Sequence, residues 1–199
     1  NNITLTDGDG TFGTLQLTGN NVSVDENAAT EIGTSTVGGT LDVISTGDIT
    51  DNGTIAVIGT TTLVALTNNI TLTDGDGTFG TLQLTGNNAT IIENAATDIG
   101  ASILGGTLTV TSAGNITDGG TISVIGTTTL NAGANNITLT DGDGTFGTLV
   151  LTANNATVDE NAATEIGTSA VGGTLDVISA GNITDNGTIA VTSTTTLNA

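Results

Sequence analysis

The segment NNITLTDGDGTFGTL occupies residues 1–15 and recurs without a single change at residues 68–82 and 135–149. Because the copies begin at Asn1, Asn68 and Asn135, the sequence period is 67 both times. Self-similarity at a fixed spacing is typical of chains whose units stack on one another, as in solenoids and repeat arrays. The spacing therefore predicts one continuous structure built from three units, residues 1–67, 68–134 and 135–199.

A shorter motif divides each repeat. In the first repeat the dipeptide Thr-Leu stands at residues 14–15, 40–41 and 62–63, and in the second it returns at residues 81–82. These positions divide the period into three segments, with lengths of 26, 22 and 19. We expect each segment to form one rung, which gives three rungs per repeat and about nine rungs in the chain.

Apolar and polar residues alternate within the segments, as in Leu15 and Leu17 around Gln16. Alternation places every second side chain on one face of a β-strand. The runs are short, rich in β-branched residues and bounded by Gly, Asn and Asp, and none has the spacing of a helix. The pattern predicts an all-β parallel β-solenoid with three short strands per rung. A β-sandwich of hairpins is the alternative, but it does not explain the repeat.

The same alternation predicts which side chains fill the interior. We expect the following residues, with their equivalents one and two repeats later, to point inward: Leu15, Leu17, Val22, Val24, Ile32, Leu41, Val43, Ile49, Ile55, Val57, Leu63, Ile70, Leu72 and Phe79.

The composition limits the possible partners. The chain has 20 Asp and Glu residues and no Lys, Arg or His, so its formal net charge is −20. Nucleic acids and anionic membrane surfaces are bound mainly through Lys and Arg, so we expect neither as a partner. No apolar run approaches the roughly 20 residues of a membrane-spanning helix, and we expect no membrane insertion. The absence of Cys excludes disulfides and fits an exported chain.

The distribution of charge along the rod follows from the predicted rungs. Identical carboxylates would recur every third rung, at about 14 Å. This spacing exceeds the Debye length of about 8 Å at physiological salt, which would limit repulsion between them.

The run from Gly38 to Leu82, GGTLDVISTGDITDNGTIAVIGTTTLVALTNNITLTDGDGTFGTL, and its later copies resemble a known family. They are similar to the β-strand repeats of giant bacterial surface proteins of the filamentous-haemagglutinin-like adhesin type. The resemblance covers the whole chain. It implies a right-handed parallel β-helix, export to the cell surface, and a role as the shaft of an adhesive or fibrous protein.

The acidic segment Asp7-Gly8-Asp9-Gly10 is the first candidate site, because alternate carboxylates are typical of calcium loops. An EF-hand would need further ligands at positions where this chain has Thr11 and Thr18. A calcium-binding β-roll would need a repeat of about nine residues. We therefore interpret the segment as a corner in which both glycines take positive φ. Calcium binding stays the alternative.

The pair Asp25-Glu26 is the second candidate, because two carboxylates can act as acid and base in glycoside hydrolysis. The equivalent residues of the second repeat are Ile92 and Glu93, so one carboxylate is missing there. We expect no catalytic activity, no cofactor and no resident metal.

Outward rows of threonine, such as Thr4 and Thr6 or residues 60–62, are the third candidate, because regular Thr rows can order water in ice-binding solenoids. The equivalent strands of other rungs lack the pattern, so we interpret Thr as a β-forming residue on a solvated face.

The chain opens and closes within the repeat pattern. We therefore expect the solenoid to continue, either through further covalent repeats or by head-to-tail stacking of chains. Together these features predict a stiff extracellular shaft at the cell surface. A module that binds calcium, carbohydrate or ice is the alternative.

Overall fold

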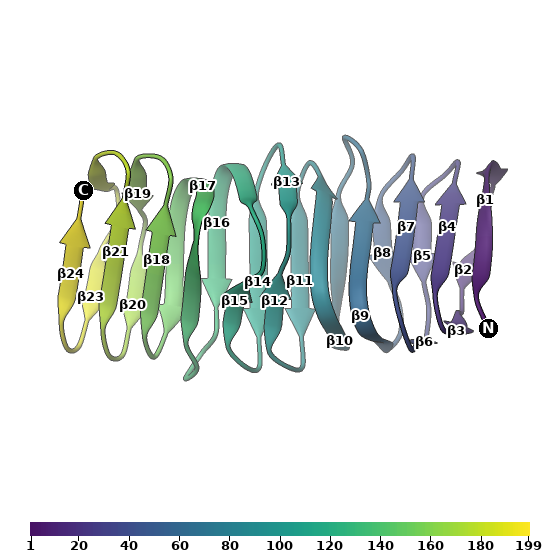
Figure 1. Cartoon of the computed structure of the whole chain (residues 1–199), viewed down its shortest axis with the longest axis horizontal. Coiled ribbons are helices and arrows are strands. Elements are labelled where there is room, and N and C mark those ends of the chain that lie inside the picture. The colour runs from purple at the N-terminus through teal and green to yellow at the C-terminus, as the bar shows by residue number, and fades with distance from the viewer.

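The repeats wind into an elongated solenoid of about ten turns, in which all 24 strands belong to one hydrogen-bonded sheet (Figure 1). The structure, a computed structural model, describes residues 1–8, 10–74, 77–141 and 144–199. These residues contain strands and turns but no helix. The strands of successive turns pair in parallel, so the predicted parallel β-solenoid is confirmed and the sandwich alternative is wrong.

The strands follow one another along the chain in short runs, with four longer strands that bend from one wall of the solenoid to the next. Their bounds are β1 (Ile3–Gly10), β2 (Thr14–Leu15), β3 (Thr18–Gly19), β4 (Val22–Glu26), β5 (Thr30–Ile32), β6 (Ser35–Val37), β7 (Leu41–Ser45), β8 (Ile49–Asp51), β9 (Ile55–Val64), β10 (Ile70–Gly86), β11 (Ala89–Glu93), β12 (Thr97–Ile99), β13 (Ser102–Leu104), β14 (Leu108–Ser112), β15 (Ile116–Asp118), β16 (Ile122–Asn131), β17 (Ile137–Ala153), β18 (Ala156–Glu160), β19 (Thr164–Ile166), β20 (Ser169–Val171), β21 (Leu175–Ser179), β22 (Ile183–Asp185), β23 (Ile189–Val191) and β24 (Thr195–Asn198).

One column of paired residues shows the length of a turn. Ile3 pairs with Val22, and Val22 pairs with Leu41. Leu41 then pairs with Thr61, and Thr61 with Leu82. The residue numbers along this column show that each turn takes about 20 residues, at the short end of the range for solenoid units. A repeat therefore contains three full turns and about half a turn more.

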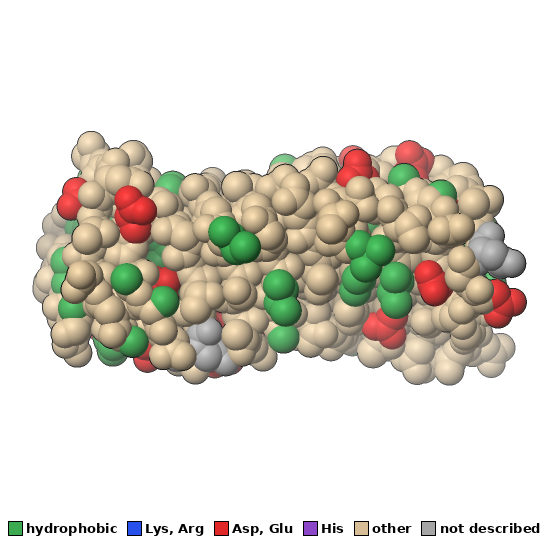
Figure 2. Space-filling view, turned by 90° about the horizontal axis from the view of Figure 1, so that it is seen from above, with side chains coloured by type: hydrophobic (Ala, Val, Ile, Leu, Met, Phe, Trp, Pro, Cys, Tyr) green, Lys and Arg blue, Asp and Glu red, His purple; other side chains and the backbone are tan. Residues whose placement is uncertain are grey.

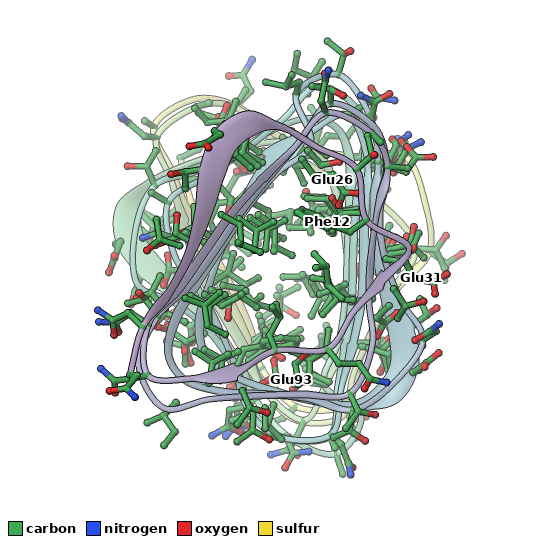
Figure 3. All side chains as sticks on the ribbon, turned by 90° about the vertical axis from the view of Figure 1, so that its right-hand side faces the viewer. Phe12, Glu26, Glu31 and Glu93 are labelled. Carbon is green, nitrogen blue, oxygen red and sulfur yellow. The ribbon has the colours of Figure 1, made fainter. Side chains whose placement is uncertain are left out.

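Because of the extra half-turn, successive repeats present the same residue on opposite sides of the rod. Ile70 is the second-repeat equivalent of Ile3, yet it pairs with Ile49 on the other wall of the solenoid. Figure 3 shows the same offset for Glu26 and Glu93, which lie at opposite ends of the cross-section. An identical residue returns to the same wall only after two repeats.

Two sequence-based expectations are corrected by this register. The Thr-Leu dipeptide does not mark one column, because Leu15 pairs with Ile32 whereas Leu41 pairs with Val22. The three unequal segments between these dipeptides are therefore not turns, and the chain has about ten turns instead of nine. Identical carboxylates also do not recur on one side at about 14 Å. They return to the same wall after about seven turns, or about 33 Å, which separates like charges further.

The predicted interior is confirmed for the first two repeats, where every expected residue is buried. The third repeat agrees as far as Val177. Three of its remaining members are only partly buried, and Leu197 is 51% exposed, because no later turn covers these strands. The partly buried residues are Ile183, Ile189 and Val191.

Polar side chains form hydrogen bonds with backbone groups at the corners of successive turns. The Asn69 side chain accepts the Asn88 backbone N–H at 3.3 Å, and the Asn88 side chain accepts the Thr107 N–H at 2.9 Å. At another corner the buried Ser102 hydroxyl accepts the Leu84 N–H at 3.0 Å and donates to the Gly100 carbonyl at 3.0 Å. These bonds satisfy backbone groups that the strand ladder leaves free where the chain bends.

Candidate functional site

The acidic segment of each repeat coincides with a β-bulge, where the pairing of the strand with the next turn shifts register. In β1, Leu5 pairs with Val24 and Gly10 pairs with Glu26, so five steps along β1 oppose two steps along β4. The same irregularity occurs in β10 and β17. The carboxylates Asp9, Asp76 and Asp143 lie outside the described residues, so the expectation for them is not tested.

The two glycines of the first acidic segment have different roles. Gly8 has a φ of +74°, as expected for a residue at a sharp bend. Gly10 does not take positive φ, so that part of the expectation is wrong. A Cβ at Gly10 would lie 2.7 Å from the ring of Phe12, so a larger residue there would require the ring to move.

A carboxylate from the preceding turn holds the later acidic segments. The Asp51 carboxylate accepts the backbone N–H of Thr73 at 2.9 Å and that of Asp74 at 3.4 Å. Asp118 makes the equivalent bonds one repeat later. Burial raises the pKa of Asp51, the neighbouring Asp74 carboxylate raises it further, and the two N–H groups oppose this. The sequence did not single out Asp51, because an Asp in a TDNG run is also typical of an ordinary turn.

A buried glutamate of the following turn lies beside the end of each acidic segment, paired with its last glycine. Glu26, Glu93 and Glu160 are 0, 2 and 1% exposed. One oxygen of each accepts the backbone N–H of a phenylalanine from the end of the bulge, at 2.6, 2.8 and 2.8 Å. The other oxygen, Oε2, is buried and has no hydrogen-bond partner in good geometry. At each corner, therefore, Oε1 of the carboxyl group is hydrogen-bonded and Oε2 is not.

The surroundings of Glu93 and Glu160 shift the pKa of these two carboxyl groups. Burial raises the pKa of Glu93, and the N–H of Phe79 and the Thr97 hydroxyl lower it. Burial likewise raises the pKa of Glu160, with Thr164 and Phe146 opposing. The hydroxyls of Thr97 and Thr164 are themselves buried and without a partner at good hydrogen-bonding geometry.

The carboxylates of Asp25 and Glu26 do not form a pair. The burial of β4 alternates along the strand, with Glu26 inside and Asp25 outside. Their side chains therefore leave the strand on opposite faces. The two groups cannot flank one glycosidic bond, which requires both carboxylates to face the same substrate.

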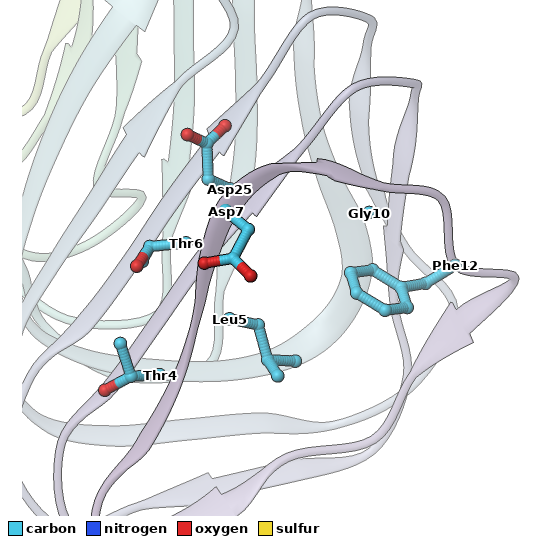
Figure 4. A pocket seen from close by; sticks show the side chains of 7 residues that line it. All are labelled: Thr4, Leu5, Thr6, Asp7, Gly10, Phe12 and Asp25. Atoms are coloured by element: carbon cyan, nitrogen blue, oxygen red, sulfur yellow. The ribbon is translucent and has the colours of Figure 1, made fainter.

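A hollow of about 240 Å³ lies at the N-terminal end of the rod (Figure 4). Leu5 in this hollow is 39% exposed, whereas its equivalent Leu72 is 1% exposed. The difference arises because a preceding turn covers Leu72, so the hollow is the uncovered end of the core. Its lining consists of Thr4, Leu5, Thr6, Asp7, Gly10, Phe12 and Asp25.

The threonine row at residues 60–62 does not face outward as a unit. Thr61 is fully buried and pairs with Leu41 and Leu82 in an apolar column. It lies inward because it is in phase with Leu63 in the alternation of β9. The expectation of an outward row is therefore wrong at this position.

Within the described part of the chain, no group of three or more Asp, Glu, His or Cys side chains is arranged to hold a metal ion. The same residues include no helix with the length and apolar character needed to cross a bilayer.

A family model described as repeats of unknown function (DUF5649) matches residues 19–85, 86–153 and 153–199. Each of the first two matches is about as long as one repeat. Neither the curated proteins nor the solved structures show a significant match to the chain.

Proposed function

We propose that this chain, which belongs to the family of repeats of unknown function (DUF5649), is a segment of the shaft of a large secreted bacterial surface fibre or adhesin. In this role it acts as a stiff extracellular spacer whose mechanism is mechanical. The resemblance of its repeats to filamentous-haemagglutinin-like adhesins supports the location at the cell surface.

The observation that carries the proposal is the unbroken strand ladder. Parallel pairing links the turns from β1 to β24, and the buried residues form one continuous aliphatic core. With about 4.8 Å between turns, ten turns form a rod about 48 Å long. A rod of this kind resists bending, because bending would stretch the ladder on one side and compress the packed side chains on the other.

The surface also fits a spacer. Figure 2 shows hydrophobic side chains as small patches on one face, with polar surface around those in the middle and acidic side chains mainly toward the two ends of the rod. Large contiguous apolar areas are the usual mark of a docking site. The chain has no Lys or Arg, so it offers no site to trypsin-like proteases, an advantage for an exposed filament.

The partner that we propose is more of the same solenoid. The outer edge of β1 and that of β24 carry strand backbone groups that a further turn would pair. Leu5 and Leu197, both partly exposed, would be covered by the same addition. Covalent continuation through further repeats is the simpler arrangement, and head-to-tail stacking of separate chains is the other.

Length measurements test the shaft proposal. Chains of three, six and nine repeats should form rods whose length, measured by negative-stain microscopy or small-angle scattering, increases by about 16 Å per repeat. This increment corresponds to three turns and about half a turn more. Particles that stay compact as repeats are added would refute the proposal.

Calcium separates the shaft from the alternative, a ligand-binding module. A ligand that binds the native state at 100 times its Kd stabilises it by about 2.7 kcal/mol. Thermal unfolding should therefore be compared in calcium, in magnesium and in chelator at equal ionic strength. A shaft gains only the screening that both cations provide equally. A specific increase with calcium would favour the binding module.

A further inference from the structure

The inward glutamates of the second and third repeats are unusual because no basic side chain in the chain can balance their charge. Glu93 and Glu160 are buried, and the chain contains no Lys, Arg or His. Natural proteins pair nearly every buried carboxylate with a cation or supply it with several hydrogen-bond donors. Here each group receives one backbone N–H on Oε1 and has no partner in good geometry on Oε2.

Among the described residues, the groups that face Glu93 are neutral. Gly77 of the preceding turn and Ser112 of the following turn pair with it in the ladder. The Ser112 hydroxyl is already donated to the Ala95 carbonyl at 2.7 Å. Phe79 donates its backbone N–H to the carboxyl group, and among the described side chains only that of Thr97 also acts on it.

Glu160 has the same surroundings one repeat later. Gly144 and Ser179 pair with it, and the Ser179 hydroxyl donates to the Ala162 carbonyl at 2.7 Å. No charged group among the described residues acts on either glutamate.

Protonation of the carboxyl group removes the buried negative charge that these surroundings leave unbalanced. A protonated carboxyl group carries a donor on one oxygen and keeps an acceptor on the other. The Oε1 atom can then accept the phenylalanine N–H, while the buried Oε2, which has no partner in good geometry, carries the proton. The neutral acid also avoids the desolvation penalty of a buried charge.

We propose that Glu93 and Glu160 bind protons as the solenoid folds, so that the corner after each acidic bulge is tightened by acid and loosened when these carboxyl groups ionise. The device sits at the junction of the bulge, the phenylalanine and the following turn. It recurs in successive repeats on opposite sides of the rod, so a long shaft would respond to pH along its whole length.

The direction of the pH dependence follows from the acidity of the two groups. Burial raises the pKa of Glu93 and of Glu160 in the folded chain above the value in the unfolded chain. The folded state therefore binds more protons, and stability falls with increasing pH. The contribution is fully present below the unfolded pKa and is lost as pH rises through the folded pKa. Asp51 and Asp118 act in the same direction, since burial raises the pKa of each.

Two substitutions on one strand separate this device from general charge repulsion. Glu160→Gln and Asp159→Asn both replace one carboxyl group of β18 by an amide, but residue 160 points inward and residue 159 outward. The free energy of unfolding of the full chain should be measured for both variants across the acidic and neutral pH range. A pH titration of the wild-type Glu160 carboxyl by carbon NMR, assigned through Glu160→Gln, supplies a reading that does not depend on the variant's stability.

We expect Glu160→Gln to gain stability relative to wild type as the pH rises, and so to flatten the pH profile. Asp159→Asn should leave its slope close to that of wild type, and the Glu160 carboxyl should titrate above the ordinary glutamate range. Parallel pH profiles for the Glu160→Gln variant and wild type would overturn the proposal. A Glu160 carboxyl that titrates at or below the ordinary range would overturn it as well.

Discussion

Substitution of Gly80 by alanine is a direct test of how closely the turns are stacked. Gly80 lies in β10 against the backbone of the preceding turn. A Cβ at this position would lie 2.6 Å from the carbonyl oxygen of Gly59 and closer still to that of Ile58. Both obstacles are main-chain atoms, so no side-chain rotation can relieve the contact. Its equivalent in the first repeat, Gly13, has no atom within 4 Å of the position that a Cβ would take, because no earlier turn lies there.

The expected effect is the difference between two opposing contributions. Overpacking a rigid site costs about 1–3 kcal/mol. An alanine also restricts the unfolded chain, which stabilises the native state by about 0.4–1 kcal/mol where the backbone conformation suits it. We therefore expect Gly80→Ala to lose about 2 kcal/mol, since the obstruction is backbone and the upper part of the steric range applies. For a chain of this length the midpoint of thermal unfolding would fall by about 4–8 °C.

Gly13→Ala provides the matched control, because it changes the unfolded chain in the same way without a steric obstacle. It should be neutral or slightly stabilising. Denaturant unfolding followed by circular dichroism gives the two free energies, and amide hydrogen exchange shows whether the loss is centred on the turns around residue 80. Equal stability of the Gly80→Ala and Gly13→Ala variants would refute the close stacking described for these turns.

Two further substitutions test the core and a corner. Leu41→Asp should unfold its turn, because it buries a charge in a chain without cations. Ile44→Asp, on the exposed face of the same strand, should change the free energy of unfolding by less than about 0.5 kcal/mol, and similar melting curves for the two variants would contradict the register. Ser102→Ala should cost about 1–3 kcal/mol by leaving the buried Leu84 N–H without its acceptor, and a change below about 0.5 kcal/mol in denaturant unfolding would show that water replaces the hydroxyl.

The candidate site was only partly predictable from sequence. The positive φ of Gly8 follows from the need for a bend between strands. The inward position of Glu26 was also present as a signal, because the alternation that places Val22 and Val24 inside continues to residue 26. This signal was overlooked because Glu26 is charged, and a carboxylate next to Asp25 is usually taken as part of a solvated pair. Its hydrogen bond to Phe12 spans the whole corner and has no local signature.

Alternation is a local property of the strand, and it therefore determined the fold class and the inward residues without knowledge of which strands pair. Leu41 is inside whichever turn lies above it. The path of the rod is not local, because the residues taken up by each bulge and corner decide where the next strand begins. Only the tertiary structure shows that a repeat ends about half a turn past its starting wall, so that Ile70 pairs with Ile49 and Leu15 with Ile32. The sequence sets this register through the summed lengths of all its bulges and corners, and these lengths can be read only once the strands of successive turns are seen to pair.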